Sequence, residues 1–145
     1  MITSVMQGVA AAIRAEFGDG YKIYIDSVEQ GFQTPCFFIA LVQRLDTSNL
    51  RGRYTVSVSL DVKYFPSDTR DLEEELFGVS ERLENVLEYI TLPGGVMLRG
   101  KERHCNTDDG ELNFYVIYET GIYSGLPADV LMEAVQVNGG VKGGE

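Results

Sequence analysis

The stretch RYTVSVSLDVKYF, residues 53–65, limits the possible folds of this chain more than any other, because apolar and polar residues alternate along all of it. Such alternation is typical of a strand with one buried face and one wet face. The expected apolar face consists of Tyr54, Val56, Val58, Leu60, Val62 and Tyr64, and the polar face of Arg53, Thr55, Ser57, Ser59, Asp61 and Lys63. We therefore expect a sheet with a core side and a solvent side.

The segment before this strand is apolar without alternation. Residues 36–45, CFFIALVQRL, carry apolar side chains on both faces, which predicts a central strand covered on both sides. Residues 46–52, DTSNLRG, have the composition of a turn. The two strands are expected to form a long antiparallel hairpin whose loop projects beyond the domain body. A shorter strand is expected over residues 21–28, followed by the polar turn EQGFQTP.

Two segments have helical periodicity. Residues 2–17 place their apolar residues on one stripe and end at Gly18, a suitable helix cap. Residues 67–90 form a second apolar seam with steps of four and three. The expected core stripes are Ile2, Val5, Met6, Val9, Ile13 and Phe17 in the first helix, and Leu72, Leu76, Val79, Leu83, Val86 and Ile90 in the second.

The rest of the chain predicts further strands. Asp109-Gly110 separates two apolar runs, and Asp-Gly is a strong hairpin signal. Residues 131–137, LMEAVQV, are a possible last strand before a glycine-rich tail that we expect to be mobile. The chain of 145 residues suits one domain. We expect an α+β fold: an antiparallel or mixed sheet of about five to six strands flanked by two main helices over residues 1–124, with residues 125–145 as a C-terminal arm.

Composition excludes some function classes. The chain has 22 acidic against 12 basic residues and a formal charge of −10, which disfavours binding to nucleic acid phosphates. The apolar N-terminus lacks a basic region and is interrupted by Arg14, so we expect a helix there and no signal peptide. The two cysteines, Cys36 and Cys105, have no CxxC spacing, which fits a reducing cytoplasm.

Chemistry-bearing residues are few. His104, the single histidine, adjoins Cys105, but neighbouring residues of a strand point to opposite faces. Cys36 remains possible as a thiol nucleophile with His104, and the alternative is that Cys36 is a small buried hydrophobe. The acidic stretch 106–111, NTDDGE, lacks the ligand spacing of a calcium loop and suits a solvated hairpin tip. We expect no catalytic residue, no cofactor and no metal site.

Candidate contact residues come from four places. Ser4, Gly8, Ala11 and Ala15 recur at steps of four, three and four on the far side of the first helix, where they allow close approach of another subunit or simply reflect the helix propensity of alanine. Phe77 lies among seven acids of the second helix. It is either an isolated exposed aromatic residue without a role or a contact with a partner. These acids are Asp71, Glu73, Glu74, Glu75, Glu81, Glu84 and Glu88. Leu50 in the hairpin loop and Val135 and Val137 in the arm complete the set.

Two stretches together resemble a known family. DSVEQGFQTPCFFIAL followed by RYTVSVSLDVKYFP is similar to small tail terminator proteins of contractile-tailed phages, defective prophages and phage-tail-like bacteriocins. The similarity covers residues 2 to 123. It implies an α+β subunit that forms a hexameric ring, without catalysis or cofactor. That ring would cap the tail tube, and the sheath, end their polymerisation and offer a docking face for the head or its connector.

The resemblance also implies partners and a location. The partners are further copies of this chain, the tail tube, the sheath protein in some systems and a neck or connector protein, while DNA passes through without specific binding and no membrane is involved. The protein would stand at the top of the virion tail after assembly in the bacterial cytoplasm. Two other functions remain open: a neck or head–tail connector completion protein, and a small cytoplasmic enzyme with Cys36 as its nucleophile.

Overall fold

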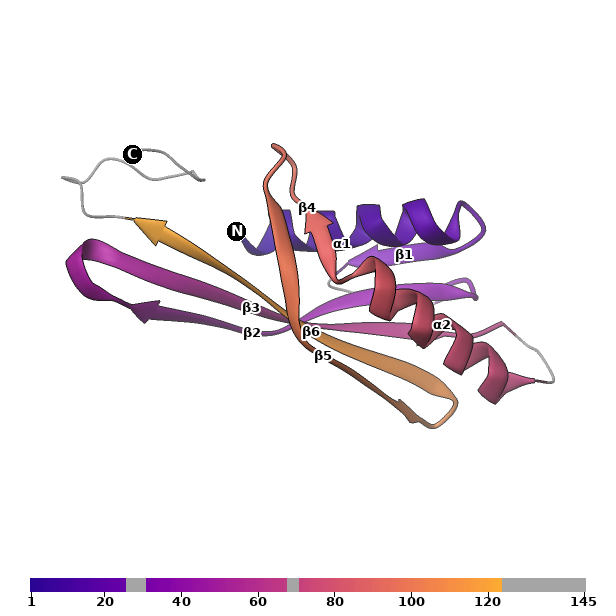
Figure 1. Ribbon diagram of the computed structural model, residues 1–145. Helices are drawn as coiled ribbons and strands as arrows, with labels where there is room; N and C mark the ends of the chain where they lie inside the picture. The colour runs from indigo at the N-terminus through magenta and orange to yellow at the C-terminus, as the bar shows by residue number, and fades with distance from the viewer. Residues whose placement is uncertain (26–30, 68–70, 124–145) are drawn as a thin grey trace.

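The computed structural model of the protein describes residues 1–25, 31–67 and 71–123 (Figure 1). Two α-helices and six strands make up the described chain. In chain order they are α1 (Ile2–Phe17), β1 (Lys22–Ile25), β2 (Cys36–Ser48), the 3-10 turn η1 (Leu50–Gly52), β3 (Arg53–Phe65), α2 (Leu72–Val86), β4 (Tyr89–Thr91), β5 (Met97–Asp108) and β6 (Glu111–Tyr123). Among the described residues, no helix has the length and apolar character needed to cross a membrane.

The strands form one mixed sheet in the order β1-β2-β3-β6-β5-β4. Strands β1 and β2 are parallel, and every other neighbouring pair is antiparallel. Buried residues of α1 and α2 belong to a single apolar cluster with the inward-facing residues of β3 and β6, so both helices cover the same face of the sheet. The expected α+β fold is confirmed.

The centre of the core lies where β3 and β6 pair. Leu60 stands opposite Val116 and Val58 opposite Tyr118, and all four are fully buried or nearly so. Directly opposed side chains of an antiparallel pair lie on the same face, so each pair contributes to the same side of the core. The Tyr118 hydroxyl donates a hydrogen bond of 2.6 Å to the Leu87 carbonyl just after α2. The alternation expected for residues 53–65 is thus confirmed on its apolar side.

Strand β2 corrects the expectation of a central strand covered on both sides. It runs on to Ser48, and only Cys36–Ile39, the part paired with β1, is largely buried. Beyond Ile39 no described strand pairs with its outer edge, and Leu41, Val42 and Leu45 are exposed. An apolar run has the same pattern whether its own domain covers it or another surface does.

The β2–β3 hairpin projects from the body of the molecule, as expected. Its strands pair from Cys36 opposite Phe65 to Ser48 opposite Tyr54, and Figure 1 shows its end well away from both helices. The turn is shorter than expected, because pairing continues through residues 46–48 and leaves η1 to close it. The end of β6 accompanies β3 along this projection, so it is three strands wide. We call residues 45–57 with 119–123 the hairpin extension.

The second helix is shorter than expected. It ends at Val86, and Ile90 lies instead in β4, where it pairs with Leu98 of β5. Ile90 is buried, so the prediction that it belongs to the core is confirmed. The prediction that it belongs to the helix was wrong. The chain leaves the helix because the Gly100 amide of β5 donates to the Glu88 carbonyl at 2.6 Å. A Cβ on Gly100 would lie 2.6 Å from the Leu87 carbonyl oxygen, so only glycine permits this approach.

The remaining expectations divide by region. The Asp109-Gly110 hairpin is confirmed: both residues have positive φ, 54° and 78°, as a two-residue type I′ turn requires. Strand β1 is found at Lys22–Ile25 within the expected 21–28, and residues 26–28 of that expectation lie outside the described chain. The possible strand at 131–137 and the arm 125–145 also lie outside the described residues.

Candidate subunit interface

The small-residue stripe of α1 already serves the fold at one position. Gly8 is buried, and a Cβ built on it would lie 3.0 Å from the Thr91 carbonyl oxygen and 3.3 Å from the Ile90 Cδ1 atom. The missing side chain therefore lets α1 approach β4 of the same chain. This packing role of Gly8 could not be read from its spacing in the helix, because β4 was not expected.

The other predicted contact residues are scattered. Ala11 and Ala15 are exposed on α1, and Ser4 is half-buried. Val135 and Val137 lie outside the described residues. The stripe as a whole is therefore not one continuous exposed surface, and its use between subunits stays a prediction.

The end of the hairpin extension combines apolar and positive side chains. Leu50 is 84% exposed, the highest value among the exposed large hydrophobic residues of the described chain. Residues 44–53 contain three arginines against one aspartate, and that aspartate, Asp46, pairs with Arg44 at 2.9 Å. By sequence, this segment therefore contains more basic than acidic residues. We call Leu50, Arg51 and Arg53 the hairpin end.

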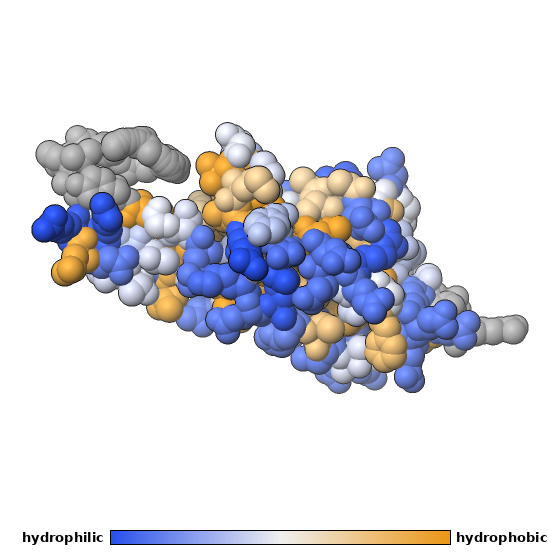
Figure 2. All heavy atoms as spheres, viewed as in Figure 1, coloured by the Kyte–Doolittle hydropathy of each residue, from blue (hydrophilic) through white to orange (hydrophobic). Residues whose placement is uncertain are grey.

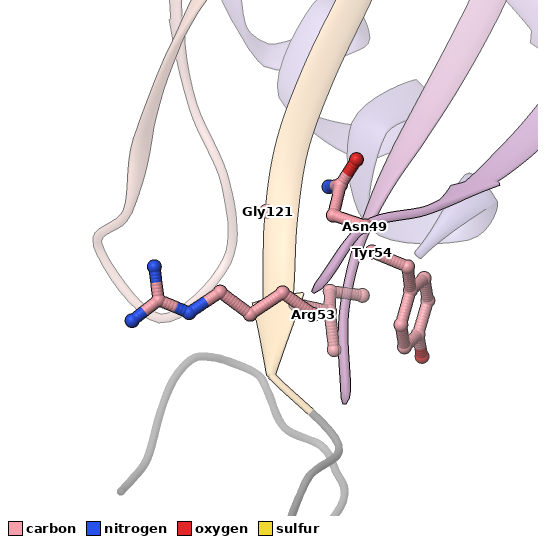
Figure 3. Close-up of a pocket in the computed structure, with 5 residues that line it drawn as sticks. Asn49, Arg53, Tyr54 and Gly121 are labelled. Atoms are coloured by element: carbon pink, nitrogen blue, oxygen red, sulfur yellow. The ribbon is translucent and has the colours of Figure 1, made fainter. Parts of the chain in front are cut away.

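A shallow hollow lies beside the hairpin end. It has a volume of about 340 Å³, and Figure 3 shows Arg53 and Tyr54 extending to opposite sides of their strand at its margin. The lining residues are Asn49, Arg53, Tyr54, Gly121 and Ile122. Gly121 contributes no side chain, so the space above β6 stays open. The sequence did not reveal this hollow, because it joins the start of β3 to the end of β6.

Helix α2 presents a negative outer face around one aromatic ring. Phe77 is 57% exposed, and Glu73 and Glu81 stand one turn before and after it, close to the same line along the helix. Residues 71–88 hold seven carboxylates against the single Arg82. Glu73 and Glu81 form no ion pair with any described residue. We call Phe77, Glu73 and Glu81 the acidic face.

The face of the sheet opposite the helices carries a partly buried ion pair. Lys63 Nζ lies 3.0 Å from Asp61 Oδ2 and donates to Asn113 Oδ1 at 2.8 Å. Asp61 is only 7% exposed, between Ala40 and Tyr115 on the neighbouring strands. Its Oδ1 atom is buried without a hydrogen-bond partner among the described residues. The expected wet face is therefore partly covered by its own cross-strand neighbours.

A second polar contact on this face joins three strands. Lys101 of β5 donates to Glu119 Oε1 at 2.9 Å, and Ser57 of β3 donates to Glu119 Oε2 at 2.8 Å. These two hydrogen bonds hold the pKa of the Glu119 carboxyl below its ordinary value, and the bond from Lys101 has the larger effect. The contact ties β3, β6 and β5 together where the hairpin extension leaves the body.

Comparison with known protein families matches residues 4–124 to the family described as phage tail terminator protein. The chain belongs to the phage tail terminator family. The resemblance seen in the sequence is thereby confirmed. A comparison with curated proteins finds no match.

Two solved structures are similar to this terminator family member. One is the sheath/tube terminator of an extracellular contractile injection system, PVC, in its extended state, with 15% identity and a TM-score of 0.53. The alignment covers 95% of this chain and 62% of that chain, so this chain spans less than two thirds of that terminator. The other is from the virion of a native gene transfer agent particle, with 13% identity, a TM-score of 0.49, and coverage of 82% and 91%.

The two stretches that carry the terminator resemblance meet in space. Phe32 of the first packs on Phe65 of the second with ring centroids 5.0 Å apart. The Gln33 amide donates to the Tyr24 hydroxyl at 3.1 Å, and Cys36 pairs with Phe65 across β2 and β3. Residues 31–35 are therefore folded back onto the strand that ends in YFP. Both stretches serve packing in the terminator fold.

The cysteine and histidine of this terminator are not brought together. Cys36 is fully buried, and burial raises the pKa of its thiol to about 11, which disfavours the nucleophilic thiolate. His104 lies three strands away in the sheet order, about 14 Å at ordinary strand spacing, and its ring stacks on Tyr115 at 4.9 Å. His104 and Cys105 stand opposite successive residues of β6 and so face opposite sides, as expected.

Proposed function

We propose that this chain is the subunit of a hexameric ring that caps the tail tube, and the sheath where one is present. The ring ends polymerisation of the tail at its final length and offers the face on which the head or its connector docks. The observation that carries the proposal is the match to the tail terminator family over residues 4–124.

The distribution of exposed side chains supports a ring. A closed ring is built from heterologous contacts, in which one patch meets a different patch on the next copy. The hairpin end and the acidic face each carry an exposed large apolar side chain, Leu50 and Phe77, and the β2–β3 hairpin and α2 are separate in the fold (Figure 1). The exposed apolar residues of β2 give the extension further surface to bury against tail proteins.

The net charge suits a ring through which DNA passes. With a formal charge of −10, the protein repels the phosphate backbone instead of holding it. The expected partners are therefore proteins: other copies of this chain, the tail tube, the sheath and the connector. Its place would be the top of the virion tail, after assembly in the bacterial cytoplasm.

Tail-tube assembly in the presence of this protein tests the proposal. Tube protein from the same particle is polymerised with and without the purified chain, and tube lengths and ends are measured by electron microscopy. We expect shorter tubes with a ring at one end. An acidic protein of similar size is the control and should leave the lengths unchanged. Unchanged lengths and bare ends with this chain would contradict the proposal, as would its purification with heads instead of tubes.

A further inference from the structure

We propose that the C-terminal arm of one copy adds a strand to the outer edge of β2 of the next copy. In this contact, residues 131–137 of the arm pair with residues 43–48 and cover the apolar side chains at that edge. The inference rests on the proposed ring and names the segment that joins its subunits. It gives Val135 and Val137, two of the predicted contact residues, a surface to bind.

The unpaired edge of β2 gives the first argument. Strand β1 pairs with Cys36–Ile39, and no described strand pairs with the outer side of residues 40–48. A strand edge without a neighbour presents backbone N–H and C=O groups to which a further strand can bind, and proline, lysine or a bulge usually blunts it. This edge has a bulge at Val42 but neither proline nor lysine, and residues 43–48 beyond the bulge keep a regular register with β3.

The exposed side chains at this edge give the second argument. Leu41, Val42 and Leu45 are 40%, 57% and 50% exposed. Figure 2 shows hydrophobic side chains among hydrophilic ones at the hairpin side of the molecule. Leu41 stands opposite the core residue Leu60, and Leu45 stands opposite Ser57 of the polar face, so the edge has apolar side chains on both faces of the sheet. A strand that covers this edge therefore needs apolar residues at both alternating positions.

The predicted last strand has this composition. In LMEAVQV, residues 131–137, Leu131, Val135 and Val137 fall on one face of a strand and Met132 falls on the other. An extended segment that joins a sheet edge gains affinity from main-chain hydrogen bonds and specificity from its alternating side chains. The segment therefore complements the open edge of β2.

The course of β6 gives the third argument, because it decides which copy supplies the arm. Strand β6 runs toward the hairpin end, where Tyr123 pairs with Arg53, and Figure 1 shows it ending on the side of the molecule away from α2. In the strand order, the open edge of β2 lies on the far side of β3 from β6, so a return within one chain meets the nearer edge of β6 first. Residues 124–130 span up to about 24 Å when extended, which lets the arm reach a neighbouring copy.

A contact of this kind suits a ring. The arm and the β2 edge are different parts of the chain, so their pairing is heterologous and repeats from copy to copy until the ring closes. Pairing of two β2 edges with one another would instead be isologous and would give a two-fold dimer. An arm that occupies the edge excludes that dimer. Each copy in the ring then gives one arm and receives one.

Disulfide trapping tests the pairing on the full-length chain. One preparation carries Leu45→Cys and another carries Val135→Cys, both with Cys105→Ser to remove the exposed thiol. After mixing and mild oxidation, we expect a disulfide between positions 45 and 135 of different copies, identified by mass spectrometry of the linked peptides. Because a shift in register can separate one pair of thiols, Val137→Cys serves as a second arm position.

A matched control and an intramolecular version sharpen this test. Val141→Cys lies on the same arm outside 131–137, and we expect at least about tenfold less cross-linked product from it. A single chain that carries both Leu45→Cys and Val135→Cys shows whether the bond forms within one copy. A bond within the chain, or equal yields from Val141→Cys, would overturn the inference.

Proline in the arm gives a readout that does not depend on thiols. Val135→Pro removes a backbone donor from the added strand, so amide hydrogen exchange over residues 43–48 should quicken about tenfold and self-association should weaken. Val141→Pro is the control and should behave as the wild type does. Unchanged exchange and assembly in Val135→Pro would overturn the arm contact, and so would protection of residues 43–48 that arises only when tube protein is added.

The outcomes distinguish this inference from the proposed function. If the wild type forms rings but positions 45 and 135 or 137 do not cross-link between copies, the arm contact fails and the ring stands. A wild type that forms no ring at any concentration would instead contradict the proposed function.

Discussion

Cys36 is the residue where a catalytic and a structural interpretation of this chain divide. The apolar residues that follow it predicted burial, and the structure places it fully inside the molecule at the start of β2. Because burial raises the pKa of its thiol to about 11, almost none of it is thiolate at neutral pH. His104, the base that sequence reasoning left open for it, is three strands away.

Thiol labelling of the native protein distinguishes a reactive Cys36 from a buried structural one. At pH 8 we expect Cys105, which is exposed, to react promptly, and Cys36 to react only after unfolding. The change Cys36→Ala should lower the free energy of unfolding by roughly 1 to 3 kcal/mol and leave assembly intact. Prompt labelling of both thiols in the folded protein would contradict this account.

Among the elements, those with a local pattern were predicted and those that depend on distant partners were not. The alternation of β3, the stripe of α1 and the Asp109-Gly110 turn are properties of neighbouring residues. The end of α2 depends on hydrogen bonding to β5, and the burial of the start of β2 depends on its pairing with β1. The periodicity of neighbouring residues predicts neither of these features.

The candidate interface follows the same division. Phe77 and Leu50 were predicted to be exposed contact residues, because Phe77 lies away from the apolar seam of its helix and Leu50 lies in a turn. Both are exposed. Their role between subunits stays a prediction. The hollow between Tyr54 and Gly121 requires the pairing of β3 with β6, which composition and spacing do not specify.

Replacing Phe77 by glutamate tests helix α2 as an interface. The side chain is exposed, so the monomer should stay folded with little change in melting temperature. Ring formation should fall, because an apolar anchor is lost and a further negative charge is added. Native mass spectrometry measures the hexamer yield. Met97→Glu is the matched control, since Met97 is 62% exposed and lies on β5 outside both patches. A normal yield from Phe77→Glu would count against the partner contact.

The molecule as an assembly unit has a one-sided core and a long projection. Both helices cover one face of the six-stranded sheet, and the hairpin extension carries exposed apolar residues away from that core. Such a shape leaves apolar surface that the described part of the chain does not bury, and contact with a neighbour would remove it from water.

Electron microscopy of the purified protein tests the central claim, which is that copies of this chain associate around a common axis to form a ring. The account predicts closed rings of six subunits with an open centre wide enough for a DNA duplex. Compact single subunits at high protein concentration, or two-fold dimers joined through identical surfaces, would contradict it.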